Sequence, residues 1–111
     1  MRITLGTGLL LALAAGASLA QQNQPAAERV KLATGLIAKR DYSNAIRELR
    51  RALELQPDHK AAREYLGELY VETGNMAKAK EQLAILAKLC PSGCEERVDL
   101  QKAISSKSAS K

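Results

Sequence analysis

The sequence predicts an all-α protein, a short right-handed α-solenoid in which two helix-turn-helix repeats precede a C-terminal capping helix. Three observations support this fold class. Matching residue types recur at one fixed long period, apolar residues recur at three- and four-residue spacing, and a proline closes each repeat. The predicted segments are a signal peptide at 1–20, a short linker at 21–25, a first repeat at 26–59, a second repeat at 60–93, a capping helix at 94–105 and a disordered tail at 106–111.

The N-terminal segment has the layout of a secretory signal peptide. Arg2 precedes an apolar run, and Ser18 and Ala20 are the small residues that signal peptidase requires before the cleaved bond. We therefore expect cleavage after Ala20 and export, with the periplasm of a Gram-negative bacterium as the destination. The alternative is an uncleaved anchor, because the apolar run approaches the roughly 20 residues that a membrane-spanning helix needs. Contact with a membrane is expected only in that case.

The 34-residue period brings the two repeats into register. The matching pairs are Leu32 and Leu66, Ala45 and Ala79, Leu49 and Leu83, and Pro57 and Pro91. This pattern resembles the tetratricopeptide repeat, a helix-turn-helix unit of the same length, although Arg29 and Arg63 stand where that family usually has tryptophan. The chain looks like the small exported tetratricopeptide proteins of bacteria. The resemblance implies a solenoid of paired helices that binds proteins or peptides.

Capping and helix-ending residues fall where the resemblance requires them. Asp41 and Asn75 are good N-cap residues and stand at the start of the second helix of each repeat. Pro57 and Pro91 follow those second helices and end them. The expected helices are 26–38, 42–55, 60–73, 76–89 and 94–105.

The fifth expected helix comes from extending the register beyond the second repeat. Leu100 lies one period after Leu66, and Gln101 replaces the small residue that the repeats have at Ala33 and Gly67. We interpret this helix as a cap, because repeat arrays need a terminal element that covers their last apolar face. Since about three repeats are usually needed for stability, the chain is expected to be a monomer stabilised by its cap, with a homodimer as the alternative.

Composition and motifs argue against catalysis. His59, the single histidine, falls in the turn between the repeats, where a solvated side chain is expected. A zinc site usually takes four protein ligands, or three and a water. The sequence offers His59 in one turn and Cys90 and Cys94 around a distant one, which does not provide such a site. A net charge of +5 without Phe or Trp does not suit nucleic-acid binding. We predict no enzymatic activity, no cofactor, no metal and no nucleic-acid partner.

The resemblance implies that the first helix of each pair lines a concave binding groove. The corresponding residues here are Val30, Thr34, Ile37, Glu64, Tyr65, Glu68, Val71, Glu72 and Asp99. Glu64, Glu68 and Glu72 recur at a spacing of four and form one acidic stripe on a helix. The Lys, Asn and Arg clamp by which some family members hold a C-terminal carboxylate is absent. We predict a scaffold of the bacterial envelope that binds a basic or amphipathic partner, while an ordinary solvated helix face remains the alternative interpretation of the stripe.

The excess positive charge falls on the second helices, at Arg47, Arg50, Arg51, Lys78 and Lys80. A second hypothesis is therefore an assembly factor that contacts a membrane or an envelope polymer through this basic convex face. Scattered solubilising charge is the ordinary alternative.

Cys90 and Cys94 flank a short turn between the last full repeat and the cap. Ser92 and Glu95 have the spacing of a capping box, with Ser92 as N-cap. Because disulfides persist in exported proteins, we predict a disulfide that ties the cap to the repeat. The alternatives are a redox-active pair in a redox-responsive adaptor, since the pKa of a free thiol near a helix N-terminus is lowered, a metal site, and two inert thiols.

Overall fold

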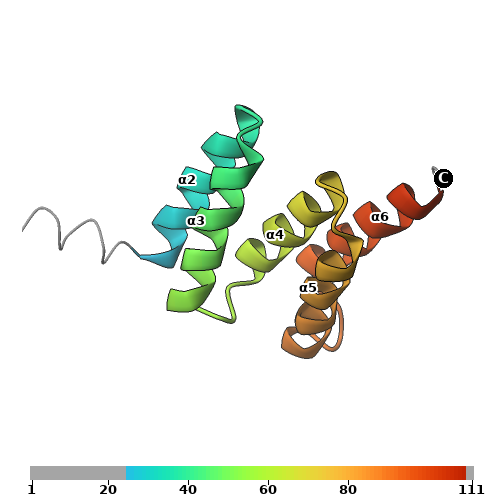
Figure 1. Ribbon diagram of the computed structural model, residues 1–111. Helices are drawn as coiled ribbons and strands as arrows, with labels where there is room; N and C mark the ends of the chain where they lie inside the picture. Colours follow the sequence, from blue (N-terminus) through green and yellow to red (C-terminus); the bar gives the residue numbers. More distant parts are fainter. Residues whose placement is uncertain (1–24, 110–111) are drawn as a thin grey trace, which may run out of the picture.

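The computed structural model describes residues 25–109, which form five α-helices (Figure 1). They are α2 (Ala26–Ala38), α3 (Tyr42–Leu55), α4 (Lys60–Glu72), α5 (Met76–Leu89) and α6 (Glu95–Ala109). Helices α2 and α3 form one hairpin, α4 and α5 form a second, and α6 packs against both helices of the second hairpin. The predicted all-α class, with two helix pairs and a C-terminal helix, is confirmed. The predicted signal peptide lies outside the described residues.

The turn inside each hairpin has the same backbone conformation in both repeats. Arg40 and Gly74, which are one period apart, both adopt a positive φ, 61° and 82°, which reverses the chain after the first helix. Asp41 then caps α3, because its carboxylate accepts hydrogen bonds from the backbone N–H and side-chain amide of Asn44 at 3.5 and 2.8 Å. Asn75 occupies the same position before α5 but makes no side-chain cap bond. Both N-caps lie where the sequence predicts them, and only Asp41 uses its side chain.

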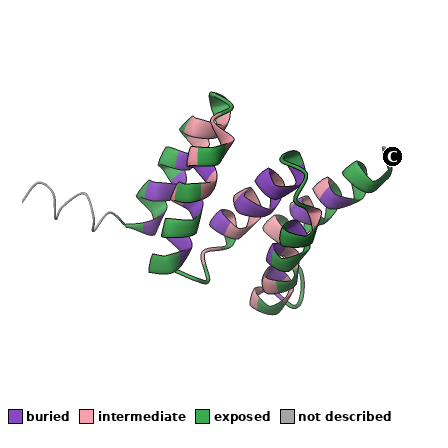
Figure 2. Cartoon of the chain, in the orientation of Figure 1, coloured by how far each residue is buried: buried purple, intermediate pink, exposed green. Residues whose placement is uncertain are grey.

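Every helix carries buried residues (Figure 2), and most of these residues are small or branched apolar ones. Ala45 and Ala79, the matching alanines of the two second helices, are completely buried and allow close helix approach. Leu49, Leu86 and Leu100 are the largest side chains that are fully buried. The core is therefore a continuous layer along the array, as expected when each repeat buries its apolar face against a neighbour.

The arginines that replace tryptophan join the two helices of each hairpin by polar contacts. The Arg29 Nη1 donates to Glu48 Oε1 at 2.8 Å in a largely buried salt bridge. In the second hairpin, Arg63 Nη1 donates to Gln82 Oε1 at 3.0 Å. Arg63 lies one period after Arg29, and Gln82 lies one period after Glu48. The second repeat thus reproduces a contact of the first as well as its residue pattern.

The same register position also fastens each incoming helix to the turn before it. Arg63 donates through Nε and Nη2 to the Pro57 carbonyl oxygen at 3.1 and 2.9 Å. In the third unit, Arg97 donates through Nη1 to the Pro91 and Cys90 carbonyl oxygens at 3.2 and 3.3 Å. Helix α6 is therefore attached to the array as the first helix of a repeat would be.

Helix α6 differs from the prediction at both ends. It begins at Glu95, and the Cys94 carbonyl oxygen accepts the Val98 N–H at 3.0 Å, so Cys94 holds the N-cap position and the predicted capping box at Ser92 is wrong. It ends at Ala109 rather than near residue 105, so the prediction of a disordered tail is wrong for 106–109. This part of the chain has no glycine or proline to end a helix.

A disulfide joins Cys90 to Cys94, with the two Cα atoms 5.9 Å apart. That distance lies in the range from which a disulfide forms without backbone movement. The predicted disulfide between repeat and cap is confirmed. It closes the turn from which α6 starts and so ties the cap to α5.

Candidate functional site

A hollow of about 410 Å³ lies between the two hairpins. Its lining residues are Thr34, Ile37, Tyr42, Tyr65, Glu68, Leu69 and Glu72, and we call this surface the inter-repeat groove. They come from the C-terminal half of α2, the first residue of α3 and the part of α4 from Tyr65 to Glu72. The groove therefore follows the junction between the two repeats.

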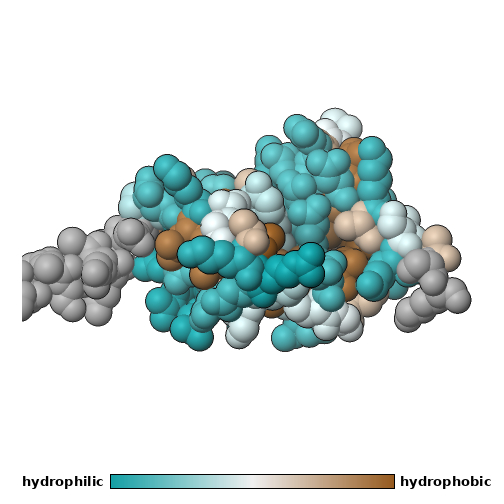
Figure 3. Space-filling view, turned by 90° about the horizontal axis from the view of Figure 1, so that it is seen from above, coloured by the Kyte–Doolittle hydropathy of each residue, from teal (hydrophilic) through white to brown (hydrophobic). Residues whose placement is uncertain are grey.

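The groove exists because the two first helices, α2 and α4, do not pack along one another. Helix α4 packs on α3, α5 and α6, while α2 packs on α3. The turns that end α2 and α4 lie on the same side of the molecule (Figure 1). Seen from that side, apolar surface appears as small areas enclosed by hydrophilic side chains (Figure 3).

Five of the predicted groove residues line this hollow, namely Thr34, Ile37, Tyr65, Glu68 and Glu72. They bring two chemistries together. Ile37 and the Tyr65 ring offer apolar and aromatic surface, and Glu68 and Glu72 add two carboxylates one helical turn apart. The arrangement suits a ligand that is itself both apolar and positively charged.

Two predicted groove residues belong to the core instead. Val30 is 8% exposed and lies on the buried stripe of α2 that includes Ala26 and Ala33, the face that packs on α3. Val71 is 6% exposed, because α4 is the central helix and is covered on several sides. The expectation that both side chains line the groove is therefore wrong.

Tyr42 and Leu69 line the groove but are missing from the sequence prediction. The resemblance assigns the groove to first helices only, whereas Tyr42 is the first residue of a second helix. The sequence did contain a signal for Tyr42. It is an aromatic residue directly after the N-cap Asp41, and the short turn from α2 places that position close to the end of α2. Leu69 had no such signal, since it has the spacing of an ordinary core residue.

Glu64 and Asp99 do not line the hollow but concentrate negative charge next to it. The pKa of Glu64 is raised to about 7, first by burial and then by the charges of Glu68, Asp99, Glu96 and Glu95. The pKa of Glu68 is also raised, by burial and then by Asp99. Within residues 25–109, no lysine or arginine forms a salt bridge with these carboxylates. Helices α4 and α6 thus hold several acids together without an internal counter-charge.

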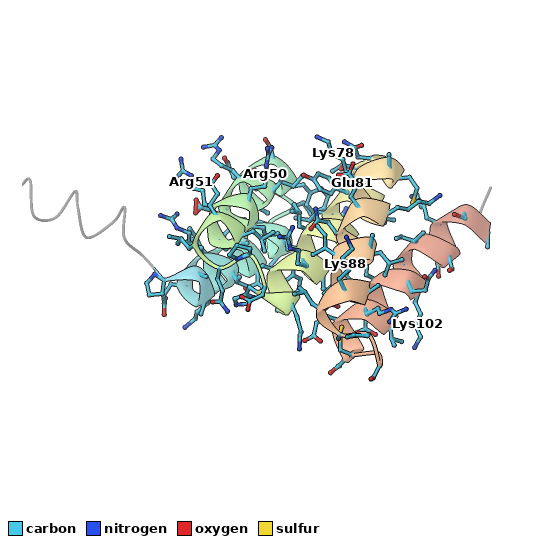
Figure 4. All side chains as sticks on the ribbon, turned by 90° about the horizontal axis from the view of Figure 1, so that it is seen from below. Arg50, Arg51, Lys78, Glu81, Lys88 and Lys102 are labelled. Carbon is cyan, nitrogen blue, oxygen red and sulfur yellow. A yellow bond between two sulfur atoms is a disulfide. The ribbon has the colours of Figure 1, made fainter. Side chains whose placement is uncertain are left out.

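Several basic residues lie on the second helices, α3 and α5. Arg50 and Arg51 on α3 and Lys78 on α5 project along one edge, with Glu81 among them (Figure 4). Arg47, Arg50 and Arg51 share a shallow surface of α3 with Glu54. Acidic residues interrupt this surface, so the described structure presents no uniform positive face.

His59 is not the solvated turn residue that the sequence predicts. Its ring Nδ1 accepts the Ala62 N–H at 3.2 Å, so the side chain is the N-cap of α4 and is partly buried. Among residues 25–109, no cluster of three or more His, Cys, Asp or Glu side chains is placed to hold a metal ion. In the same range, no helix is long and apolar enough to cross a membrane.

A comparison with protein-family profiles finds the tetratricopeptide repeat over residues 30–93, more than half of the chain. The chain belongs to the tetratricopeptide repeat family. A search of curated proteins and a search of solved structures found no match. Tetratricopeptide repeats are typically non-catalytic modules that bind other proteins. Family membership therefore implies that this chain is a protein–protein interaction scaffold.

Proposed function

We propose that this tetratricopeptide protein is a non-enzymatic scaffold of the bacterial envelope that holds a basic or amphipathic segment of a partner protein in the inter-repeat groove. The observation that supports this proposal is the composition of the groove. Ile37 and the Tyr65 ring provide apolar contact, and Glu68 and Glu72 provide charge, within one hollow of about 410 Å³. A purely apolar or a purely basic partner would match only half of that lining.

The two halves of the lining have different roles in binding. Burial of apolar surface against Ile37 and the tyrosine rings supplies affinity, at roughly 25 cal/mol per Å² removed from water before the costs of association. The carboxylates attract a basic segment from a distance and exclude an acidic one, so they act mainly on association rate and selectivity. A net positive chain with a locally acidic groove is therefore selective for basic partners.

Location in the envelope is supported by the sequence and by the disulfide. Arg2, the apolar run and the small residues Ser18 and Ala20 have the layout of a cleaved leader. The Cys90–Cys94 disulfide suits an oxidising compartment, because cytosolic thiols are kept reduced.

The proposal of a non-enzymatic role is supported by the roles of His59 and the two cysteines. His59 caps a helix, and both cysteines are in the disulfide.

In-cell photo-cross-linking tests this proposal. A benzoylphenylalanine is placed at Thr34, which lines the groove, and in a matched strain at Glu54, an exposed residue of α3 outside it. We expect a discrete cross-linked partner from the Thr34 position and none of the same mass from Glu54. Cross-linking that is equal at both positions, or absent at Thr34, would overturn the proposal.

A charge variant sharpens the same experiment. Glu64→Gln, Glu68→Gln and Glu72→Gln together remove the acidic stripe with little change in shape. The variant is expected to lose at least about tenfold in cross-linking yield at low ionic strength, since close charges across an interface commonly contribute more than about 1.4 kcal/mol. An unchanged yield would show that the stripe is only a solvated helix face.

A further inference from the structure

We propose that the inter-repeat groove holds one long cationic side chain of the partner, an arginine or a lysine, with its aliphatic stem on Ile37 and its charge among the tyrosine rings and the carboxylates of Glu68 and Glu72. This inference rests on the proposed function, because it names the part of the partner that the groove recognises. Every group it uses lines the same hollow.

The carboxylates determine the sign of the charge that the groove favours in a ligand. Glu68 and Glu72 lie one helical turn apart on α4 and both reach the hollow. Neither forms a salt bridge with a lysine or arginine of residues 25–109. Asp99 lies close enough to raise the pKa values of both Glu64 and Glu68, so acidic groups beyond the lining also act on the hollow. A cationic group is the ligand that this arrangement favours most.

The tyrosines favour the same charge. A cation over the face of an aromatic ring is attracted by the ring's quadrupole when it lies within about 6 Å of the centroid. Tyr42 from α3 and Tyr65 from α4 bring two rings to the hollow from two helices. The molecule already contains such a pair elsewhere, with the Lys78 Nζ 5.6 Å from the centroid of the Tyr70 ring.

The apolar residues determine the length of the ligand. Lysine and arginine bury their methylene stems on apolar surface while their charged ends stay near polar groups. Ile37 offers such surface in the same hollow as the carboxylates, whereas Leu69 is only 4% exposed. A volume of about 410 Å³ lies within the roughly 300–1,000 Å³ of small-ligand sites. It suits one side chain with its backbone, and it is too small to enclose a whole helix.

The experiment is an NMR titration of the oxidised chain with N-acetyl-arginine amide. N-acetyl-citrulline amide, which is nearly the same shape but neutral, is the matched control ligand. The sequence contains three tyrosines and no Phe or Trp, so each aromatic ring signal can be assigned. We expect the ring signals of Tyr42 and Tyr65 to shift with the arginine amide and those of Tyr70 to stay in place. The citrulline amide is expected to bind at least tenfold more weakly.

Two variants test the named groups. Glu68→Gln with Glu72→Gln should weaken binding of the arginine amide at least fivefold, while Glu81→Gln, an exposed acid of α5, should leave it unchanged. Tyr65→Leu keeps the apolar surface and removes one ring, and a two- to fivefold loss is expected. Far-ultraviolet circular dichroism confirms that each variant is folded.

The failure of this inference is distinguishable from the failure of the proposed function. Equal binding of the arginine and citrulline amides, or no effect of the Glu68 and Glu72 changes, would overturn the cation site. A specific cross-link at Thr34 that persists in that case would leave the groove as the binding site of a different ligand. Loss of the cross-link together with normal binding of the arginine amide would overturn the protein partner instead.

Discussion

The two junctions of this array bury equivalent residues, Leu66 at one and Leu100 at the other, but only one of them carries the inter-repeat groove. At the junction of the second hairpin with α6, a Cβ added to Gly67 would lie 2.5 Å from Leu100 Cδ2, and Leu100 is completely buried. At the junction of the two hairpins, Ala33 holds the position of Gly67, and the inter-repeat groove remains between α2 and α4. We call the first the closed junction and the second the open junction.

The difference shows how a short repeat protein separates stability from binding. The closed junction combines a glycine contact, a disulfide and the Arg97 hydrogen bonds. The open junction keeps aromatic and acidic side chains at its surface. Since repeat arrays depend on nearest-neighbour contacts, strengthening the terminal contact allows the internal one to stay available for a partner.

The strongest test of the closed junction is Leu100→Ala. Leu100 is fully buried, so the change removes apolar contacts and leaves a cavity. We expect a loss of about 3 kcal/mol in the free energy of unfolding, measured by urea denaturation. Leu32→Ala is the matched control, since Leu32 has the same register position but is 51% exposed, and its effect should stay within about 0.5 kcal/mol. Similar losses for the two variants would show that burial of Leu100 does not stabilise the closed junction.

Reduction of the disulfide should weaken the closed junction without affecting the open one. The short loop from Cys90 to Cys94 contributes roughly 2 kcal/mol in the chain-entropy model. We expect dithiothreitol to lower the free energy of unfolding by up to about that amount and to speed hydrogen exchange in α6. The Cys90→Ala, Cys94→Ala double variant should not respond to dithiothreitol. Faster hydrogen exchange in α2 rather than in α6 after reduction would contradict the assignment of the disulfide to the closed junction.

Two glycine substitutions compare a tight helix contact with an open one. Gly67→Ala forces a Cβ against Leu100, whereas nothing lies within 4 Å of a Cβ on Gly35. Overpacking should outweigh the gain in helix propensity at Gly67, so a net loss of about 1 kcal/mol is expected there. Gly35→Ala should stabilise the protein by about 0.5–1 kcal/mol. Thermal unfolding of the two variants measures both signs, and a stabilising Gly67→Ala would mean that α6 moves away freely.

The smallest expected effect concerns charge next to the open junction. The pKa of Glu64 is about 7 in the folded chain against an ordinary value of 4.5. The folded state then binds the proton more tightly than the unfolded state, so stability falls as the pH rises from about 4.5 to about 7. Glu64→Gln removes this loss and should raise the free energy of unfolding above pH 7 by about 0.5–1 kcal/mol, given solvent screening of a partly exposed group.

The control for this charge effect is the same measurement at pH 4, where native Glu64 is protonated. Native and variant chains should then be almost equally stable. A variant that is less stable than the native chain at pH 8 would show that the ionised Glu64 is favourable in the folded state, contrary to its environment.

The closed junction could be predicted from the sequence more fully than the open one. The spacing of Leu66 and Leu100 placed the cap in register, and two cysteines together with a predicted signal peptide led to the prediction of the disulfide. Pattern and capping chemistry act locally, so Asp41 and Pro57 were enough to place helix ends. The end of α6 was missed because a polar segment without Gly or Pro gives no stop signal.

The groove was predicted only in part, because its shape depends on how two hairpins are inclined and on which face of each helix is covered. Sequence spacing placed Thr34 and Glu68 correctly. It could not show that Val30 faces α3 and that Val71 is covered on the central helix, nor that Tyr42 reaches in from the next helix. The role of His59 was missed because an imidazole nitrogen is an uncommon N-cap.

One measurement tests the central claim most directly, that the open junction binds and the closed junction stabilises. The backbone amide signals of the oxidised chain are followed by NMR while a peptide of alternating leucine and arginine is added. We predict that the largest shifts fall at residues 34–42 and 65–72, with little change at residues 91–102. Shifts centred on α6, or along the convex surface of α3, would contradict the account.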